Sequence, residues 1–173
     1  MIIWINGPFG VGKTTTADRM VRRRPTLRIF DPERVGDLLM GSLRGVEADI
    51  VDFQDLAAWG ELVPLVARRV SEISGQDLVA VQTVLSKAGW DRLRSGLDAQ
   101  GLGVFQVLLD ADDAILRARV EADAIEPNAR QWRLDHLDAV AGARSWLIRR
   151  ADLVIDTSSV DADTVAAEIL RHV

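Results

Sequence analysis

Residues 7–14 have the types and the spacing of a loop that binds phosphate. They read Gly-Pro-Phe-Gly-Val-Gly-Lys-Thr and fit the pattern G-x-x-x-x-G-K-[ST] at every fixed position. The glycines let the backbone curl so that successive N–H groups point at a bound phosphate, and Lys13 adds a cation that reaches the β- and γ-phosphates. The hydroxyl group of Thr14 is placed to bind Mg²⁺. We therefore expect this segment to bind a nucleoside triphosphate.

The residues on either side of the loop support this interpretation. The apolar residues 1–5 are typical of a strand, and residues 14–24 can continue as a helix. A helix that begins near Lys13 directs the positive end of its dipole at the same anion. This context argues against the alternative, a glycine-rich turn without a ligand. The predicted contacts of the loop with ATP are Gly7, Phe9, Gly10, Val11, Gly12, Lys13, Thr14 and Thr15.

The length and composition of the chain limit the classes of protein it can belong to. With 173 residues, 48% of them hydrophobic, it can bury one sizeable core, and we expect a single domain over residues 1–173. The net charge of −5 argues against nucleic acid as a partner. The lack of cysteine excludes disulfides and thiolate chemistry and favours the cytoplasm. The sequence predicts neither a signal peptide nor a membrane-spanning segment.

Short apolar runs alternate with longer helical patterns, which is typical of an α/β fold with a parallel sheet covered by helices on both faces. The predicted strands, apolar on both faces, are residues 2–6, 27–30, 78–82, 104–109 and 153–156. The predicted helices are residues 13–24, 33–43, 53–74, 87–100, 113–123, 129–147 and 162–172. We expect a kink or a break at Pro64, and a small lid at approximately residues 121–135, where residues 122–128 interrupt the helical periodicity.

Polar residues follow each predicted strand at the point where the strand ends. The carboxyl ends of parallel strands lie at one edge of a sheet, where ligands bind in such folds, so we expect these residues to line one rim. They are Asn6, Gly7, Asp31, Gln82, Thr83, Asp110, Asp156 and Thr157.

Asp31 is the candidate for acid–base chemistry at this rim. Its carboxylate is suited to accept a proton from an acceptor hydroxyl or to hold Mg²⁺ through water. The alternative is a cap, since Asp31-Pro32-Glu33 also opens a helix well. Arg34, one turn further on, either binds a substrate anion or lies on a solvated helix face.

The strand predicted at residues 78–82 runs into Gln82-Thr83 and lacks the Asp that many phosphate-loop enzymes carry there for magnesium. Metal binding then rests on Thr14, water and Asp31, or catalysis is weak or absent. The side chains of Gln82 and Thr83 can donate hydrogen bonds to a substrate or to the γ-phosphate, and simple capping of the strand end is the alternative.

Four arginines flank the predicted lid, with Arg117 and Arg119 before it and Arg130 and Arg133 after it. Arg130 and Arg133 are one helical turn apart and share a face. Such arginines can neutralise charge that develops on a transferred phosphoryl group when a lid closes. For any single arginine the alternative is a surface ion pair, and we expect at least one of the group to reach phosphate.

The remaining candidates for chemistry have structural interpretations. The isolated His136 and His172 suit surface or capping roles rather than a metal site. The tryptophans are interpreted as core or subunit contacts, with one of them a candidate for the acceptor pocket because of its neighbours. They are Trp90, Trp132, Trp146 and the exception, Trp59.

The order strand, phosphate loop, helix, strand and Asp, with an arginine-flanked lid late in the chain, resembles the nucleoside- and nucleotide-kinase-like phosphate-loop proteins. This resemblance covers nearly the whole chain and implies a five-stranded sheet in the order 2-3-1-4-5. It implies that Arg119 packs on adenine or touches phosphate. It also implies that the backbone at Thr157 and Ser158, after the last strand, brackets the adenine.

The first two-thirds of the chain also resemble the bacterial tunicamycin resistance protein family. Residues 1–14 look like the start of that family almost residue for residue, and so do Asp31-Pro32-Glu33 with Gly36 and Asp52-Phe53-Gln54 followed by Trp59. The family implies ATP-dependent protection against tunicamycin, a uridine-containing antibiotic, by phosphorylation or by sequestration. This chain departs from the family at Val81-Gln82-Thr83, where a Pro-Met-Thr-like end is expected.

Together these features predict a Mg²⁺-dependent phosphotransferase that moves phosphate from ATP to a nucleoside-type antibiotic. Lys13 holds phosphate, Asp31 is the base, and Arg119 with Arg130 or Arg133 stabilises the transferred group. The predicted acceptor pocket consists of Asp31, Arg34, Phe53, Gln54, Trp59 and Thr83. The alternatives are a protein that sequesters the drug without chemistry, and a kinase of another hydroxylated compound such as chloramphenicol. The chain is compatible with a monomer or a homodimer.

Overall fold

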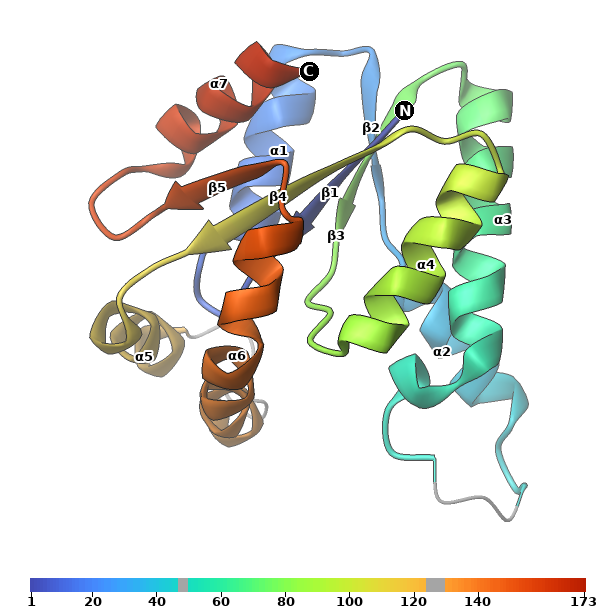
Figure 1. Cartoon of the computed structure of the whole chain (residues 1–173), viewed down its shortest axis with the longest axis horizontal. Helices are drawn as coiled ribbons and strands as arrows, with labels where there is room; N and C mark the ends of the chain where they lie inside the picture. The colour runs from blue at the N-terminus through green and yellow to red at the C-terminus, as the bar shows by residue number, and fades with distance from the viewer. Residues whose placement is uncertain (47–49, 124–129) are drawn as a thin grey trace.

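The computed structural model describes residues 1–46, 50–123 and 130–173, and its centre is a sheet of five parallel strands (Figure 1). The strands are β1 (Ile2–Asn6), β2 (Leu27–Phe30), β3 (Asp77–Val81), β4 (Val104–Asp110) and β5 (Leu153–Asp156). Their order across the sheet is β2-β3-β1-β4-β5, and every neighbouring pair is parallel. The predicted fold class and strand order are both confirmed.

Helices connect the strands and cover the sheet. They are α1 (Lys13–Arg23), α2 (Glu33–Ser42), α3 (Ala57–Ser74), α4 (Lys87–Ala99), α5 (Asp113–Ala122), α6 (Arg130–Arg150) and α7 (Ala162–His172), with a single 3₁₀ turn, η1 (Phe53–Asp55). The bounds of β1, β2, β5 and α7 are those predicted, and the other predicted elements differ by a few residues at their ends. Part of the predicted lid, residues 124–129, lies outside the described residues.

The helix predicted over residues 53–74 is interrupted at a different place from the one expected. The break falls at Leu56, whose φ of −74° and ψ of 120° are extended, and α3 then runs unbroken through Pro64. The predicted break at Pro64 is therefore wrong. Close packing against α4 supports the helix there, since a Cβ atom on Gly96 would lie 2.7 Å from the Cγ atom of the Pro64 ring. Packing of this kind can outweigh the one backbone hydrogen bond that a proline removes.

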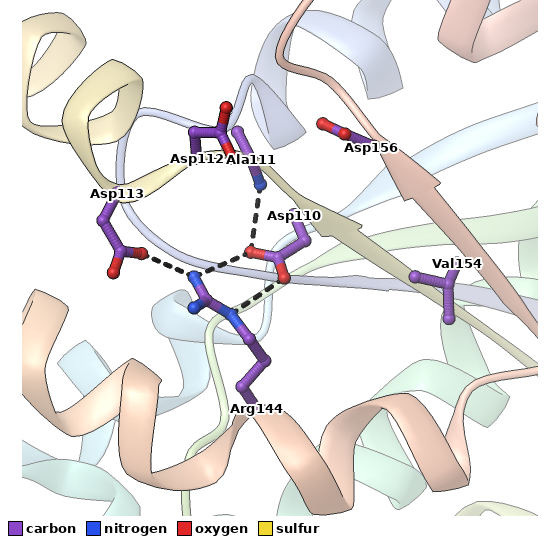
Figure 2. A pocket seen from close by; sticks show the side chains of 7 residues that line it. All are labelled: Asp110, Ala111, Asp112, Asp113, Arg144, Val154 and Asp156. Atoms are coloured by element: carbon purple, nitrogen blue, oxygen red, sulfur yellow. Dashed lines mark hydrogen bonds and ion pairs between the residues drawn. The ribbon is translucent and has the colours of Figure 1, made fainter.

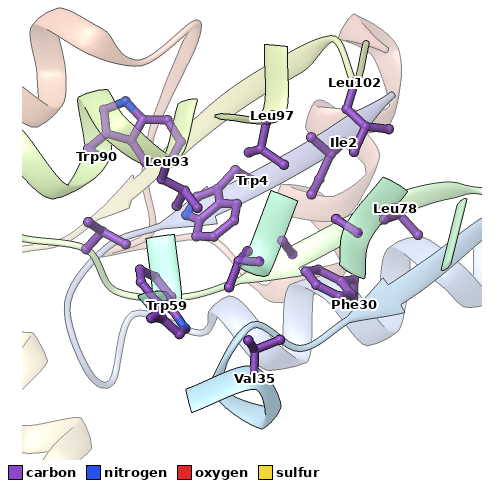
Figure 3. Close-up of a cluster of buried hydrophobic side chains, with 14 of the residues drawn as sticks. Ile2, Trp4, Phe30, Val35, Trp59, Leu78, Trp90, Leu93, Leu97 and Leu102 are labelled. Carbon is purple, nitrogen blue, oxygen red and sulfur yellow. The ribbon is translucent and has the colours of Figure 1, made fainter. Parts of the chain in front are cut away.

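Alternation along β1 sends apolar side chains into two separate cores. Ile2 and Trp4 face a core (Figure 3) beneath α3, α4 and α6. This core contains four of the five tryptophans. Ile3 and Ile5 face a second core beneath α1 and α7. Every residue of β1 is buried, as a central parallel strand requires. The expectation that all five strands are covered on both faces is wrong for the two edges, because Ile29 of β2 is 41% exposed and Val154 of β5 is 44% exposed.

The carboxyl ends of the strands lie along one rim of the sheet, between α5 and α6 on one side and α2 and η1 on the other (Figure 1). Asn6 fixes the middle of this rim. Its side chain accepts hydrogen bonds from the backbone N–H groups of Gly7 and Val84, at 2.8 and 3.1 Å, and donates one to the Val84 carbonyl at 3.0 Å. Because the Asn6 side chain is fully buried, these bonds hold the end of β1 against the segment that follows β3.

Candidate functional site

The phosphate loop leaves β1 through a backbone that only glycine can adopt. Gly7 has a φ of +145°, and a Cβ atom there would lie 2.3 Å from the Leu109 carbonyl oxygen of β4. Gly12 is left-handed, with φ +93° and ψ 19°, and caps the amino terminus of α1. These two glycines turn the chain sharply between β1 and α1, so the N–H groups at the start of α1 face the centre of the curl.

Lys13 lies inside the loop and donates hydrogen bonds to two of the loop's own carbonyl groups. Its Nζ atom is 2.8 Å from the Gly7 oxygen and 2.7 Å from the Pro8 oxygen, and the residue is 9% exposed. Burial, with a smaller contribution from the Arg133 guanidinium, lowers the pKa of Lys13 from 10.5 to about 7. The two carbonyl partners of Lys13 are neutral, and a polyphosphate bound in the loop would bring negative charge next to its ammonium group.

Thr14 and Thr15 are exposed at the first turn of α1, next to Lys13. The Thr14 hydroxyl and the half-exposed Asp31 carboxylate are oxygen ligands, the kind that Mg²⁺ prefers. In the described part of the chain, no group of three or more acidic or histidine side chains could hold a metal by itself. Mg²⁺ commonly binds through one or two protein oxygens together with water and substrate phosphates.

Arg119 of α5 connects the loop to the segment that follows β5. Its guanidinium donates to the Thr157 hydroxyl at 3.2 Å and to the Thr157 carbonyl at 2.8 Å. The Thr157 hydroxyl donates in turn to the Val11 carbonyl of the loop at 3.3 Å. The neighbouring Ser158 accepts a hydrogen bond from the Asp112 N–H at 3.0 Å. The structure therefore brings Arg119, Thr157 and Ser158 together beside the loop.

Arg133 and Arg130 lie on α6, which packs against α5 on the same side of the rim (Figure 1). Arg133 forms an ion pair with Asp123 at 2.7 Å, and its Cζ atom lies 5.6 Å from the centre of the Phe9 ring. Lys13 Nζ lies 5.4 Å from the centre of that ring. Arg130 donates to the Asp123 carbonyl at 3.3 Å. The ion-pair alternative thus holds for Arg133, which nevertheless lies close enough to lower the pKa of Lys13.

Asp31 and Arg34 lie at the start of α2. The Asp31 carboxylate accepts a hydrogen bond from the Glu33 N–H at 3.0 Å, although Pro32, not Asp31, is the N-cap residue of α2. It also lies 3.6 Å from the Nε atom of Arg34, whose side chain is 84% exposed. The Asp31 side chain is 43% exposed, and this exposure keeps the carboxylate accessible at the rim.

The acceptor residues predicted around η1 occupy different depths. Phe53 packs on Gly36, where a Cβ atom would lie 2.4 Å from the Phe53 Cγ atom. Trp59 is 2% exposed, donates from Nε1 to the Pro32 carbonyl at 3.0 Å, and packs behind Phe53 with 5.5 Å between ring centres. Phe53 is therefore the more accessible of the two rings, and Trp59 supports it from the core.

Gln54 and Thr83 connect η1 to the phosphate loop. The Gln54 amide donates to the Thr83 carbonyl at 3.1 Å, and the Thr83 hydroxyl donates to the Gly7 carbonyl at 2.8 Å. Thr83 is 8% exposed, so its hydroxyl is used within the protein. The same Gly7 oxygen also accepts a hydrogen bond from Lys13. A shift of Lys13 towards a ligand would therefore change the hydrogen bonding at the Gly7 carbonyl, which Thr83 shares.

A hollow of about 320 Å³ lies beyond the ends of β4 and β5 (Figure 2). Its walls carry four carboxylates, from Asp110, Asp112, Asp113 and Asp156, and one cation, Arg144. Arg144 pairs with Asp110 at 2.9 Å and with Asp113 at 2.7 Å, and mainly the hydrogen bond to Asp113 raises its pKa. An excess of negative charge makes this hollow unsuitable for a triphosphate, so the phosphate loop remains the candidate site.

Sequence reasoning missed an aromatic contact at the tip of the loop. The Phe9 ring lies 5.1 Å from the Trp132 ring in an edge-to-face arrangement, and Trp132 packs on His136 with ring centres 3.8 Å apart. His136 Nδ1 also contacts the Trp132 carbonyl at 2.7 Å. Trp132 is thus not a core residue, because it is 49% exposed. It is not an isolated surface residue either, because it contacts Phe9 and His136. A signal was present, because Trp132 directly precedes the predicted phosphate-binding Arg133.

The fold and the site together define a phosphate-loop protein with a kinase-like, nucleotide-binding architecture. An AAA domain family model matches residues 2–143. Among solved structures, the tunicamycin resistance protein of Deinococcus radiodurans is 30% identical, with a TM-score of 0.75 over 99% of this chain and 94% of that one. The chain therefore belongs to the AAA domain family and to the tunicamycin resistance protein family.

Two further structures share the fold at lower identity. A sugar kinase from Janibacter sp. is 16% identical, with a TM-score of 0.71 over 98% of this chain and 92% of that one. The APS kinase of Mycobacterium tuberculosis, solved with AMPPNP and APS, is 17% identical, with a TM-score of 0.66 over 98% and 95%. No protein with a curated description matches the chain. Within the described ranges, no helix has the length and apolarity needed to cross a membrane.

Proposed function

We propose that this protein transfers the γ-phosphoryl group of ATP to a hydroxyl group of a nucleoside-type antibiotic such as tunicamycin. The observation that carries the proposal is Lys13, a buried cation held by two loop carbonyls beside a second cation, Arg133. Such an arrangement is costly without an anion and becomes favourable when a polyphosphate occupies the loop. Membership of the tunicamycin resistance protein family supports the choice of acceptor.

The loop amides and Lys13 would bind the β- and γ-phosphates, and Lys13 would exchange the Gly7 and Pro8 carbonyls for phosphate oxygens. Thr14 and Asp31 would hold Mg²⁺, which neutralises phosphate charge when bound. Arg119, with Thr157 and Ser158, would contact the nucleotide beside the loop. Because the reaction consumes ATP, we place the protein in the cytoplasm.

Asp31 would act on the acceptor hydroxyl. The hydroxyl oxygen attacks the γ-phosphorus, a new P–O bond forms, the bond from the γ-phosphorus to the bridging oxygen of ATP breaks, and ADP leaves. The hydroxyl proton passes to the Asp31 carboxylate, which is exposed enough to return it to water. Arg133 or Arg130 would stabilise the charge on the transferred group. Arg34, Phe53, Gln54 and Thr83, with Trp59 behind Phe53, would surround the acceptor.

The second candidate function is ATP-dependent sequestration of the drug without chemistry. It is favoured by the end of β3, where Gln82-Thr83 follows Val81 without a carboxylate for the metal. Incubation with ATP, Mg²⁺ and tunicamycin, followed by mass spectrometry of the drug, separates the two. Phosphoryl transfer adds the mass of one HPO₃ group, whereas sequestration returns drug of unchanged mass that co-elutes with the protein.

A kinase of another hydroxylated metabolite or antibiotic is the remaining alternative. A panel that includes chloramphenicol and sugar acids, screened for ATP consumption, would identify such an acceptor. Turnover of one of these compounds without any turnover of tunicamycin would replace the proposed acceptor and leave the proposed reaction intact.

A further inference from the structure

Thr83 follows β3 and connects the phosphate loop to η1 through both of its polar groups. Its hydroxyl donates a hydrogen bond to the Gly7 carbonyl at 2.8 Å, and its own carbonyl accepts one from the Gln54 amide at 3.1 Å. Thr83 is 8% exposed, so both bonds lie largely out of water. It is therefore the residue at which η1, on the acceptor side of the rim, meets the loop that contains Lys13.

The position of the Thr83 hydroxyl is fixed by its neighbours. The next residue, Val84, is bonded through both its N–H and its carbonyl to the buried Asn6 side chain, at 3.1 and 3.0 Å. Asn6 also accepts a hydrogen bond from the Gly7 N–H at 2.8 Å. One side chain thus positions the donor and the acceptor of the bond between Thr83 and Gly7, so this bond is in place before any ligand binds.

The Gly7 carbonyl has two donors in the unliganded chain. Lys13 Nζ and the Thr83 hydroxyl both lie 2.8 Å from its oxygen, and they occupy the two lone pairs of a carbonyl. Gly7 is buried, so its oxygen depends on protein donors. When Lys13 turns towards a phosphate, the hydroxyl of Thr83 stays on this oxygen. Without that hydroxyl, the same movement would leave a buried carbonyl unpaired, which opposes ligand binding.

We propose that Thr83 is a positioning residue for triphosphate binding, because its hydroxyl keeps the Gly7 carbonyl bonded while Lys13 moves to the phosphates. The proposal rests on the nucleotide site of the proposed function, but it does not require phosphoryl transfer. It also makes the affinity of the loop depend on Gln54, which holds the Thr83 carbonyl from η1. A change on the acceptor side of the rim then alters the binding of a ligand in the loop.

Thr83→Val tests this role, because it removes the hydroxyl and keeps the shape of the side chain. Lys13 still bonds to Gly7 in the unliganded variant, so the midpoint of thermal unfolding should change little. Calorimetry with tripolyphosphate and Mg²⁺ should show a Kd raised about tenfold. Thr83→Ser restores the hydroxyl and should restore the affinity. Thr26→Val is the matched control at an exposed threonine just before β2, opposite the rim, and should bind as the natural chain does.

A purely structural role for Thr83 predicts the reverse pattern. Thr83→Val would then lower the unfolding midpoint of the unliganded chain and leave the Kd for tripolyphosphate unchanged. That result would overturn the proposal. An equal rise in Kd for Thr83→Val and Thr83→Ser would overturn it as well, because serine keeps the hydroxyl.

The connection to η1 is tested by Gln54→Met, alone and together with Thr83→Val. Alone, it removes the bond to the Thr83 carbonyl and should raise the Kd for tripolyphosphate about threefold. Added to Thr83→Val it should have no further effect, because Gln54 acts through the hydroxyl that is already absent. Gln76→Met removes a similar bond, to the Pro25 carbonyl, and should leave the Kd unchanged. Effects of Gln54→Met and Thr83→Val that simply multiply would overturn this connection.

This proposal and the proposed transfer can fail separately. Tripolyphosphate binding that depends on the Thr83 hydroxyl, without phosphate on any acceptor, would refute the transfer and support the role of Thr83. Phosphorylation of tunicamycin by the natural chain, with the same Kd for tripolyphosphate in Thr83→Val, would do the opposite. A natural chain that binds no tripolyphosphate would overturn both.

Discussion

The two sides of the rim are built in different ways, with α5 and α6 on one side and α2 on the other (Figure 1). On the side proposed for the nucleotide, hydrogen bonds connect Arg119, Thr157 and the Val11 backbone. On the side proposed for the acceptor, the Asp31 carboxylate stays exposed and the Phe53 ring packs on Gly36 of α2. Bonds to main-chain groups suit a reactant that is constant, such as a triphosphate. Side-chain surfaces suit a reactant that differs between relatives, and they are where selectivity is expected.

The comparison is sharpest at Asp31, where the largest effect is expected. Asp31→Asn removes the proposed base but keeps the hydrogen bond to Glu33 possible, so kcat should fall by about 10²- to 10⁴-fold while ATP affinity is unchanged. Steady-state kinetics together with calorimetry of ATP binding would measure both. Asp37→Asn, at an exposed position of the same helix, should behave like the natural chain. A full transfer rate in Asp31→Asn would show that another group takes the proton.

Lys13 is the corresponding test of the nucleotide-binding loop. Lys13→Met removes charge-assisted hydrogen bonds to phosphate and should weaken ATP binding by about 100-fold. Lys87→Met removes a lysine whose partner is Asp91 on the exposed surface of α4, and it should leave ATP binding unchanged. Equal ATP affinities of Lys13→Met and Lys87→Met would show that ATP does not bind at the phosphate loop.

The lowered pKa of Lys13 gives this loop a dependence on pH. Above about pH 7, and up to 10.5, the unfolded chain holds a proton on Lys13 that the folded chain has released. The free energy of unfolding should therefore rise with pH across this window, by at most about 1.4 kcal/mol per pH unit, and Lys13→Met should lack this rise. Above pH 7, ATP binding should take up a proton, which calorimetry in buffers of different ionisation enthalpy would detect. Binding without proton uptake at pH 8 would contradict the lowered pKa.

The sequence predicts the parts of this structure whose contacting residues are close together in the chain, and it predicts poorly the contacts between residues that are far apart in the chain. The phosphate loop and the bounds of β1 and β2 follow from local patterns, glycines and short apolar runs. The contact between Phe9 and Trp132 joins residues far apart in the sequence, so the only signal for it was indirect, the position of Trp132 next to Arg133. The helix is not broken at Pro64 for the same reason, because the packing that supports it comes from Gly96 on another helix.

Two glycines of α2 test the acceptor side through variants with smaller expected effects. A Cβ atom on Gly36 would overlap the Phe53 ring, whereas a Cβ atom on Gly41 would meet nothing within 4 Å. Gly36→Ala should therefore displace Phe53, lower the free energy of unfolding by about 1–3 kcal/mol and raise KM for the acceptor, with ATP binding unchanged. Gly41→Ala should stabilise the helix by up to about 1 kcal/mol. Equal, stabilising effects at both positions in thermal unfolding would mean that Phe53 does not pack on Gly36.

The smallest effect is expected at Arg144, which holds α6 to the end of β4 and the start of α5 (Figure 2). Its side chain is 30% exposed, so Arg144→Gln should lower the free energy of unfolding by about 1 kcal/mol. Urea unfolding measures this change. Arg171→Gln, which removes an exposed ion pair with Glu168, should have no measurable effect. A loss of ATP binding in Arg144→Gln would mean that its ion pairs do more than stabilise the fold.

A crystal structure with AMPPNP and Mg²⁺ tests the central claim most directly. The account predicts that the β- and γ-phosphates lie within hydrogen-bond distance of the amides of residues 7–14, and that Lys13 Nζ has left the Gly7 and Pro8 carbonyls for phosphate oxygens. It also predicts the Asp31 carboxylate on the far side of the γ-phosphate. A nucleotide bound elsewhere, with Lys13 still on those two carbonyls, would contradict it.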